Sequence, residues 1–145
     1  HDAVPRRMAD LPARAARAGA TVEILETVDP ERRFDLVLCD VPCSGSGSWR
    51  RDPEGKWRLT QDELERLGTV QSEILDTAAA LVASGGILAY ATCSVLRQEN
   101  EAQVRAFTGR WPSARLTAER RWSLTDGTDG FYSAHLTLGD AEATL

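Results

Sequence analysis

The chain is organised around the stretch Phe34–Trp57, which reads FDLVLCDVPCSGSGSWRRDPEGKW. This stretch begins with an apolar run over residues 34–40, which predicts a buried parallel strand. Pro42 has no backbone N–H for a neighbouring strand, so regular pairing is expected to stop there. In an open α/β sheet, ligands bind just beyond the carboxyl ends of the strands. An acid (Asp40), a thiol (Cys43) and a Ser-Gly loop at that edge favour an active site over a capped strand with an idle surface loop.

A second apolar run repeats this pattern. Residues 86–92, GILAYAT, predict another buried strand, and it also ends in a thiol, Cys93. If the two strands are neighbours, Cys43 and Cys93 face one crevice, where a thiolate of lowered pKa is a strong nucleophile. Cys39 lies inside the first strand and is expected to be a core residue. The matched pair of strand-ending thiols favours a functional role for Cys43 and Cys93.

Composition limits the class of protein. The chain has 145 residues, of which 42% are hydrophobic and 27% charged, as expected for one soluble, cytoplasmic domain over residues 1–145 with no membrane partner. Three Cys and two His, without CxxC spacing, disfavour a disulfide framework and a metal site. The net charge of −5 argues against a generally basic surface, but Arg50, Arg51 and Lys56 form a local basic cluster.

Helical and strand patterns alternate along the chain, which predicts an α/β fold with a mostly parallel, doubly wound sheet. Helices are expected at 6–18, interrupted by Pro12, at 60–83, with a break near Gly68, and at 97–109. Strands are expected at 20–25, 34–40, 86–92, 115–117 and 131–138, the last as an antiparallel edge strand.

Two of these helices carry more specific predictions. Thr60 with Glu63 fits a capping box at the start of the second helix. In the third helix, helical spacing places two apolar residues inward and three charged residues, Glu99 among them, outward. The inward residues are Val104 and Phe107, and the other outward residues are Glu101 and Arg105.

Several thiol chemistries are compatible with this arrangement. A cysteine hydrolase requires a His base, and only His1 and His135 are present, one terminal and one in the last expected strand. A redox pair would be expected as CxxC. Thiol addition to C6 of a pyrimidine, which makes C5 nucleophilic, needs a thiolate and an acid that bonds the ring N3 and amino group. Asp40 is the candidate acid. A thiol enzyme acting on an unrelated small molecule and a non-catalytic binding module remain as alternatives.

Two long motifs carry a resemblance to a known family. DVPCSGSG and RRDPEGKW (residues 40–57) and YATCSVLRQEN (residues 90–100) resemble successive signatures of the Sun/Fmu family of RNA cytosine-5 methyltransferases. The helix segment QSEIL (residues 71–75) and the closing DGFY (residues 129–132) are similar to further family segments. Val41, where the family has Ala, is the one evident departure within these motifs.

The resemblance implies a Rossmann-like methyltransferase domain that uses S-adenosylmethionine and acts on RNA, with ribosomal RNA expected. It assigns Cys93 as the nucleophile and Cys43 to product release. Asp40 would contact the cytosine or the methionine end of the cofactor. Further cofactor contacts are assigned to Pro42 in the first motif, Asp2 at the ribose and Glu26 at the adenine.

RNA contacts are expected in the basic loop of the first motif. Arg50, Arg51 and Lys56 would neutralise phosphates, and Trp49 or Trp57 would stack on a base. The family's first strand and glycine-rich cofactor loop have no counterpart in these residues. The chain therefore resembles the carboxyl-terminal part of the catalytic domain, and the alternatives are a fragment inactive alone and an RNA-binding or partner module derived from the fold.

Overall fold

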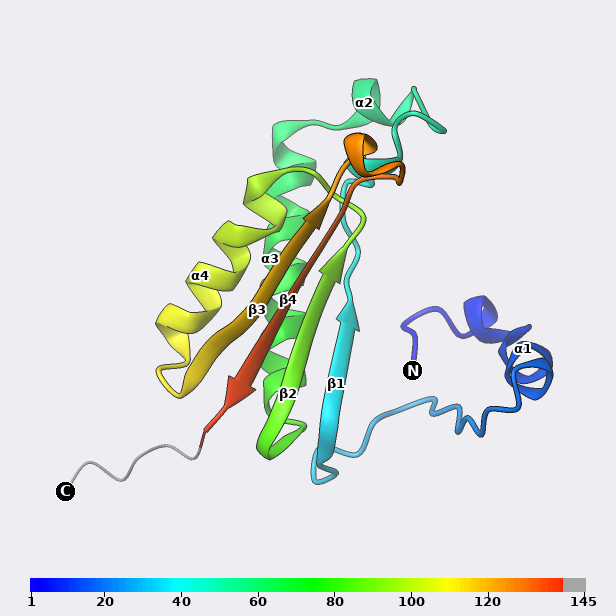
Figure 1. Cartoon of the computed structure of the whole chain (residues 1–145), viewed down its shortest axis with the longest axis vertical. Coiled ribbons are helices and arrows are strands. Elements are labelled where there is room, and N and C mark those ends of the chain that lie inside the picture. The colour runs from blue at the N-terminus through cyan, green and yellow to red at the C-terminus, as the bar shows by residue number, and fades with distance from the viewer. Residues whose placement is uncertain (140–145) are drawn as a thin grey trace. The chain divides into compact units, whose positions relative to one another are not determined.

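We describe the protein from a computed structural model that covers residues 1–139 (Figure 1). The chain divides into two compact units, His1–Arg32 and the part from Arg33 onward. One methyltransferase domain over residues 1–145 stays a prediction. Residues 140–145 lie outside the described part.

The first unit contains a 3₁₀ helix, η1 (Pro5–Met8), and α1 (Leu11–Arg17). Pro12 stands in the first turn of α1, where its missing N–H costs nothing, and it separates two short helices as expected. The strand predicted for residues 20–25 is wrong, because that segment does not form a strand. A strand needs a hydrogen-bonded neighbour, and the described residues of this unit contain none.

The second unit is built on a sheet of order β1-β2-β4-β3. The strands are β1 (Phe34–Asp40), β2 (Val82–Thr92), β3 (Ala114–Trp122) and β4 (Phe131–Leu138). β1 and β2 are parallel, as predicted, and their carboxyl ends lie at the same end of the sheet (Figure 1).

The remaining pairs make the sheet mixed. β4 runs antiparallel to β2 and to β3, so the described sheet has a smaller parallel share than the sequence suggested. β4 is antiparallel as expected, but it lies inside the sheet and β3 forms the edge. The short connection between β3 and β4 lets them pair as antiparallel neighbours, and the other edge of β4 pairs with β2. β3 is also longer than the three residues predicted.

The helices of this unit are α2 (Gly55–Arg58), α3 (Gln61–Ala79) and α4 (Glu101–Arg110). Thr60 caps α3 by accepting a hydrogen bond from Glu63 N at 3.2 Å, which is one half of the predicted capping box. The Glu63 carboxylate accepts from Arg66 instead of from the backbone of Thr60. The predicted break near Gly68 is wrong, because α3 is continuous there. The carbonyl of Gly68 accepts a bond from Gln103 of α4 at 3.0 Å, which ties the two helices together.

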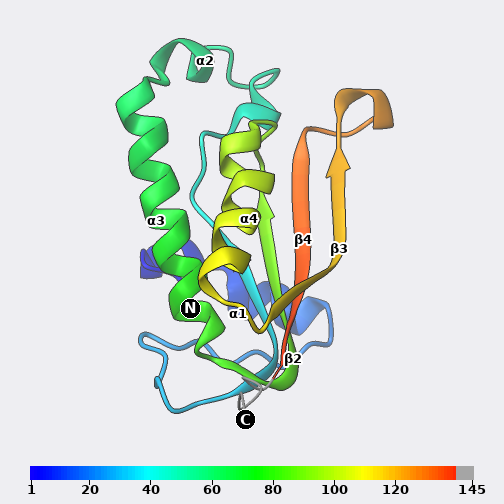
Figure 2. The same ribbon diagram turned by 90° about the vertical axis from the view of Figure 1, so that its left-hand side faces the viewer.

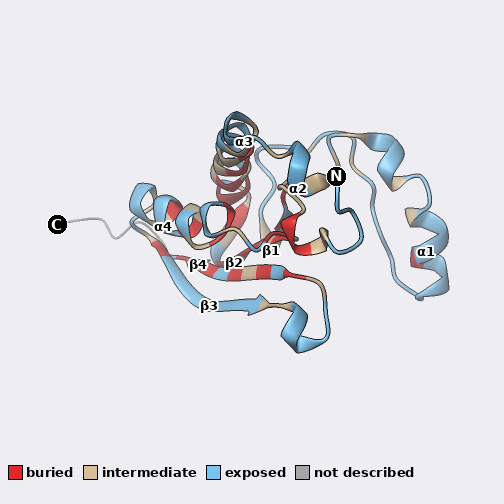
Figure 3. Cartoon of the chain, turned by 90° about the horizontal axis from the view of Figure 1, so that it is seen from above, coloured by how far each residue is buried: buried red, intermediate tan, exposed pale blue. Residues whose placement is uncertain are grey.

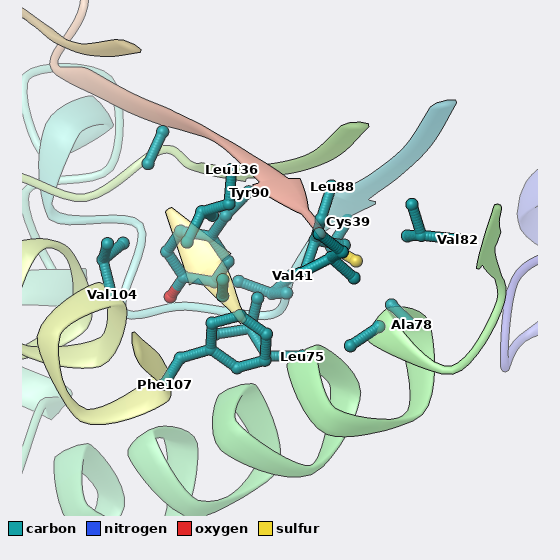
Figure 4. Packing of buried hydrophobic residues seen from close by; sticks show 14 of the residues in the cluster. Cys39, Val41, Leu75, Ala78, Val82, Leu88, Tyr90, Val104, Phe107 and Leu136 are labelled. Carbon is teal, nitrogen blue, oxygen red and sulfur yellow. The ribbon is translucent and has the colours of Figure 1, made fainter. Parts of the chain in front are cut away.

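α3 and α4 cover the same face of the sheet (Figures 2 and 3). The core lies between them and the strands, where Leu75 and Phe107 meet Leu88, Tyr90 and Leu136 (Figure 4). Cys39 is buried in this cluster, which confirms its predicted core role, and burial raises the pKa of its thiol to about 11. Within residues 1–139, no helix combines the length and apolar character that crossing a bilayer requires.

β1 is less buried than its apolar run suggested. Leu36 and Leu38 are 60% and 65% exposed, whereas Val37 and Cys39 face the helices. Alternate residues of a strand point to opposite faces, so one covered face buries only every second side chain. An apolar run alone does not distinguish a strand covered on one face from a strand covered on both.

Candidate active site

The two strand-ending thiols lie against each other. The hydrogen-bonded ladder between β1 and β2 pairs Asp40 with Ala91, so the segments that follow the two strands leave the sheet side by side. Three residues after Asp40 and two after Ala91, the sulfurs of Cys43 and Cys93 are 3.4 Å apart. The predicted shared location of these two thiols, at the carboxyl ends of adjacent parallel strands, is confirmed.

The thiol pair shares one proton between two chemically unequal sulfurs. The pKa of Cys93 is lowered to about 7, chiefly because Cys43 donates a hydrogen bond to its thiolate. Burial and the charges of Asp40 and Glu99 oppose this effect but do not outweigh it. The same hydrogen bond, followed by burial, raises the pKa of Cys43. The two pKa directions favour Cys93 as the thiolate of the pair and Cys43 as the proton donor.

A buried carboxylate joins the two loops that carry these cysteines. Glu99 is 0% exposed and lies in the 3₁₀ helix η3 (Arg97–Glu99). Ser44, which follows Cys43, donates to it from its backbone N at 2.8 Å and from its hydroxyl at 2.5 Å. The hydroxyl of Ser94, which follows Cys93, donates at 2.5 Å. The side-chain amide of Gln71 donates to the same carboxylate at 3.1 Å and to Pro42 O at 3.0 Å.

The position of Glu99 corrects the sequence prediction, which placed it on the outer face of a continuous helix. The predicted helix 97–109 is interrupted at Asn100, whose φ of −116° and ψ of −104° separate η3 from α4. Asn100 is also buried, and it binds Thr92 Oγ1 at 2.6 Å and Ser94 O at 2.9 Å. These buried polar bonds override helical periodicity, so both side chains turn into the site.

The Ser-Gly loop packs against the chain just before β4. Gly47 N donates to Cys93 O at 2.9 Å, and Gly130 N donates to Gly47 O at 2.9 Å. The backbones are so close that a Cβ on Gly47 would lie 1.9 Å from Gly130 O. Ser46 adds a hydroxyl contact of 2.9 Å to Ser94 and accepts from Val95 N at 2.9 Å. Glycine at both contact positions thus allows three loops to meet beside the thiol pair.

The predicted RNA-contacting arginines converge on one acid. Arg50 and Arg51 pair with Asp129 at 3.0 and 2.5 Å, and the Asp129 side chain is only 10% exposed. Both arginine side chains remain about two-thirds exposed, at 63% and 67%. Two guanidinium groups share one carboxylate, so the cluster keeps a net positive charge next to the thiol-bearing loops.

The third predicted cation, Lys56, lies in α2. Its Nζ is 5.4 Å from the centroid of the Trp57 ring. Trp57 is 81% exposed, whereas Trp49 is partly buried and its ring N–H is enclosed without a hydrogen-bond partner. Of the two rings proposed for base stacking, Trp57 is therefore the more accessible.

The residues predicted to bind a cofactor fall into two groups. Asp40 and Pro42 are exposed at the end of β1, next to the thiols. Asp2 and Glu26 belong to the first unit, where Asp2 accepts a hydrogen bond from Val4 N at 2.7 Å and Glu26 is exposed. The described residues contain no group of three or more His, Cys, Asp or Glu suited to hold a metal.

Sequence reasoning missed the residues that hold the site together: Glu99, Asn100, Ser44, Ser94 and Gln71. Glu99 and Asn100 stood in the second motif, and Ser follows Cys in both motifs, but helical periodicity gave no sign that Glu99 is buried. The repeated Cys-Ser pair is the signal that could have indicated a common partner for both loops.

The family model for the 16S rRNA methyltransferases RsmB/F matches residues 7–137. The chain belongs to the RsmB/F family.

Curated relatives include ribosomal RNA small subunit methyltransferase B of Salmonella arizonae, 40% identical over 73% of this chain and 27% of the relative. The protein of the same name from Vibrio cholerae is 43% identical over 72% of this chain and 26% of its own length. The chain thus spans about a quarter of the length of these RsmB/F relatives.

Solved structures show the same fold. The protein PH0851 superposes with a TM-score of 0.83 and 32% identity, over 93% of this chain and 35% of that chain. NSun6 from Pyrococcus horikoshii, solved with SFG, gives a TM-score of 0.80 at 22% identity over 94% of this chain and 40% of its own, a likeness of fold alone. The Rossmann-like methyltransferase fold expected for an RsmB/F member is confirmed.

The close approach of Gly47 and Gly130 predicts that two Gly→Ala substitutions change the free energy of unfolding in opposite directions. Gly47→Ala should lower the unfolding free energy by about 1–3 kcal/mol, since its Cβ meets rigid backbone atoms. At Gly109 in α4, an added Cβ would have no atom of another segment within 4 Å. Gly109→Ala should therefore raise the unfolding free energy by up to about 1 kcal/mol. Urea denaturation measures both changes, and equal shifts for the two variants would contradict the packing described.

The shared proton predicts a pH-dependent thiol reactivity. Alkylation of Cys93 by iodoacetamide should follow a midpoint near pH 7, because its pKa is about 7. Cys43→Ala removes the donor, so the midpoint should rise toward the ordinary value of about 8.5. Peptide mass spectrometry resolves each thiol, and Cys39, with a pKa of about 11, serves as the unreactive internal reference. A midpoint that Cys43→Ala leaves unchanged would contradict the hydrogen-bond assignment.

Proposed function

We propose that this protein methylates C5 of cytosine in RNA, with ribosomal RNA as the expected substrate, through a covalent bond between Cys93 and the base. The observation that carries the proposal is the 3.4 Å contact between the two motif thiols at the ends of adjacent parallel strands. Membership of the RsmB/F family supports it. Because the chain spans about a quarter of its relatives, activity is proposed for the intact protein.

Two adjacent thiols of unequal pKa suit an addition–elimination reaction. The Cys93 thiolate adds to C6, forming the S–C6 bond, and the electrons of the C5=C6 bond move to C5, which becomes the nucleophile. C5 forms a bond to the methyl group as the methyl–sulfur bond of the sulfonium donor breaks, and the donor leaves as a neutral thioether. A base from solvent then takes the C5 proton, the electrons of that C–H bond restore the C5=C6 double bond, and the S–C6 bond breaks, so that Cys93 leaves as the thiolate. Cys43 assists this elimination, since its sulfur lies within contact distance of the Cys93 sulfur.

The pKa directions support this division of roles. A group that attacks carbon must be present as thiolate, and the pKa of Cys93 is lowered to about 7. Cys43 holds the proton, because its own pKa is raised by the bond it donates to Cys93 and by burial. Sequence chemistry alone left both cysteines open as the nucleophile.

S-adenosylmethionine is the cofactor of this proposal and supplies an electrophilic methyl group on a sulfonium. The exposed carboxylate of Asp40, beside the paired sulfurs, fits a cationic donor and also suits the N3 and amino edge of a cytosine. Pro42, the other proposed cofactor contact of this motif, lies between Asp40 and Cys43 and is also exposed. Asp2 and Glu26 remain the proposed contacts to the ribose and adenine.

The basic loop is the proposed RNA contact. Arg50, Arg51 and Lys56 would neutralise phosphates, and the exposed ring of Trp57 would stack on a base. Asp129 does not remove this capacity, because a guanidinium has five donors and both arginine side chains stay largely exposed. The target base must leave its stack before C6 reaches a thiol.

The covalent mechanism predicts opposite outcomes for the two thiols. In the intact protein, Cys93→Ala should abolish methylation, because C5 of cytosine is a poor nucleophile without addition at C6. Cys43→Ala should accumulate a protein–RNA adduct, since addition proceeds but elimination is impaired. A denaturing gel with RNA and S-adenosylmethionine distinguishes them, and Cys39→Ala is the matched control without effect. The reverse pattern would assign the nucleophile to Cys43.

The RNA contact predicts a change in salt dependence. Arg51→Gln with Lys56→Gln should weaken RNA binding and reduce the slope of log K against log salt by about 0.7 for each lost contact to single-stranded RNA. Arg105→Gln with Arg115→Gln changes the net charge equally, at exposed positions in α4 and early β3. Filter binding at several salt concentrations measures both pairs. Equal slopes for the two pairs would argue against a contact at the basic loop.

A further inference from the structure

We propose that Glu99 is a positioning residue, whose buried carboxylate holds the loops of Cys43 and Cys93 at sulfur-to-sulfur contact. This inference rests on the function proposed above for the two thiols. Glu99 has no described hydrogen bond to either sulfur and acts through the serine that follows each cysteine.

The carboxylate of Glu99 accepts hydrogen bonds from both cysteine loops and from α3. Oε1 accepts from Ser44 N at 2.8 Å and from Gln71 Nε2 at 3.1 Å. Oε2 accepts from the hydroxyls of Ser44 and Ser94, each at 2.5 Å. Oε2 therefore bridges the residue after Cys43 to the residue after Cys93.

This bridge lies where the backbone ladder has ended. Val41 N donates to Ala91 O at 3.2 Å, and the next backbone bond between the loops runs from Gly47 N to Cys93 O at 2.9 Å. Between these bonds the first loop contains Pro42 and Cys43, and side chains join it to the second loop. The Ser44–Glu99–Ser94 bridge is thus placed to set the distance between the sulfurs.

Geometry and charge can be separated at this position. In Glu99→Gln, the amide oxygen can keep the two donors on Oε1, and the NH₂ can donate to the serine oxygens, which accept as readily as they donate. The bridge then survives without its charge. In Glu99→Asp the charge survives, but the side chain is shorter by one methylene and cannot span both loops from the same backbone position.

The two variants should move the reactivity of Cys93 in different ways. The ionisable groups acting on Cys93 are Cys43 from the first loop, Asp40 from the end of β1 and Glu99 from η3. Loss of the Glu99 charge removes an effect that raises the Cys93 pKa, so Glu99→Gln should leave the alkylation midpoint at or slightly below its wild-type value. Glu99→Asp should raise it by about one unit or more, because Cys43 no longer donates.

The experiment is iodoacetamide alkylation of Cys93 against pH in the intact protein, with thermal unfolding measured in parallel. Glu101→Gln is the matched control, since Glu101 binds Arg121 and lies outside the cysteine loops. Ser44→Ala with Ser94→Ala is a second way to break the bridge if Glu99→Asp does not fold. In a Cys43→Ala background, Glu99→Asp should cause no further shift, because Asp keeps the charge and the positioning effect on Cys93 requires Cys43.

The outcomes are decisive in both directions. An upward midpoint shift in Glu99→Asp that Glu99→Gln lacks, and that disappears without Cys43, supports positioning. Equal shifts in Gln and Asp, or an undiminished shift in the Cys43→Ala background, overturn it. In the methylation assay, the rate of Glu99→Asp at pH 7 should fall about fivefold or more and recover at higher pH, which a loss of stability alone would not produce. Alkylation needs neither RNA nor cofactor, so failure of the proposed function would appear separately, as methylation retained by Cys93→Ala.

Discussion

A single buried carboxylate organises the site. Burying a charge is costly unless hydrogen bonds replace its water, and Glu99, at 0% exposure, takes its donors from three segments of the chain. Ser44 and Ser94 supply donors because each follows a cysteine at the end of a strand. The Cys-Ser repeat in the two motifs therefore has a physical explanation: the cysteines carry the chemistry that we propose, and each serine attaches its loop to a common partner.

The same network extends to the surface that we propose for RNA. Gly47 binds both the Cys93 carbonyl and Gly130, and the neighbouring Asp129 holds the two arginines of the basic loop. The thiols and the cationic loop are consequently fixed to one framework at the carboxyl end of the sheet. This connection explains how a chain with a net charge of −5 can present positive charge beside its reactive sulfurs.

Elements with strong local patterns were predictable from the sequence. The strands over residues 34–40 and 131–138 have the bounds that their apolar patterns and flanking turn residues indicated. The strand expected at 20–25 failed because pairing is not a local property. Glu99 was placed outward because periodicity assumes an unbroken helix, and the break at Asn100 arises from bonds to Thr92 and Ser94 that no local pattern shows. The cysteine pair could be predicted because parallel strands share their carboxyl ends, but its sulfur-to-sulfur contact depends on side-chain bonds.

The contact between the sulfurs of Cys43 and Cys93 is the chief influence on the pKa of Cys93. Two acids, Asp40 and Glu99, oppose its ionisation, and burial opposes it as well, yet its pKa is lowered to about 7 because Cys43 donates a hydrogen bond. In many thiol enzymes a cation lowers the pKa; here the chief cause is a neutral donor, whose effect falls steeply as the distance between the sulfurs grows. The thiolate thus depends on geometry rather than on a neighbouring positive charge. A carboxylate close to a thiolate is unfavourable in charge alone, so the presence of Glu99 at this position is best explained by the geometry that it maintains.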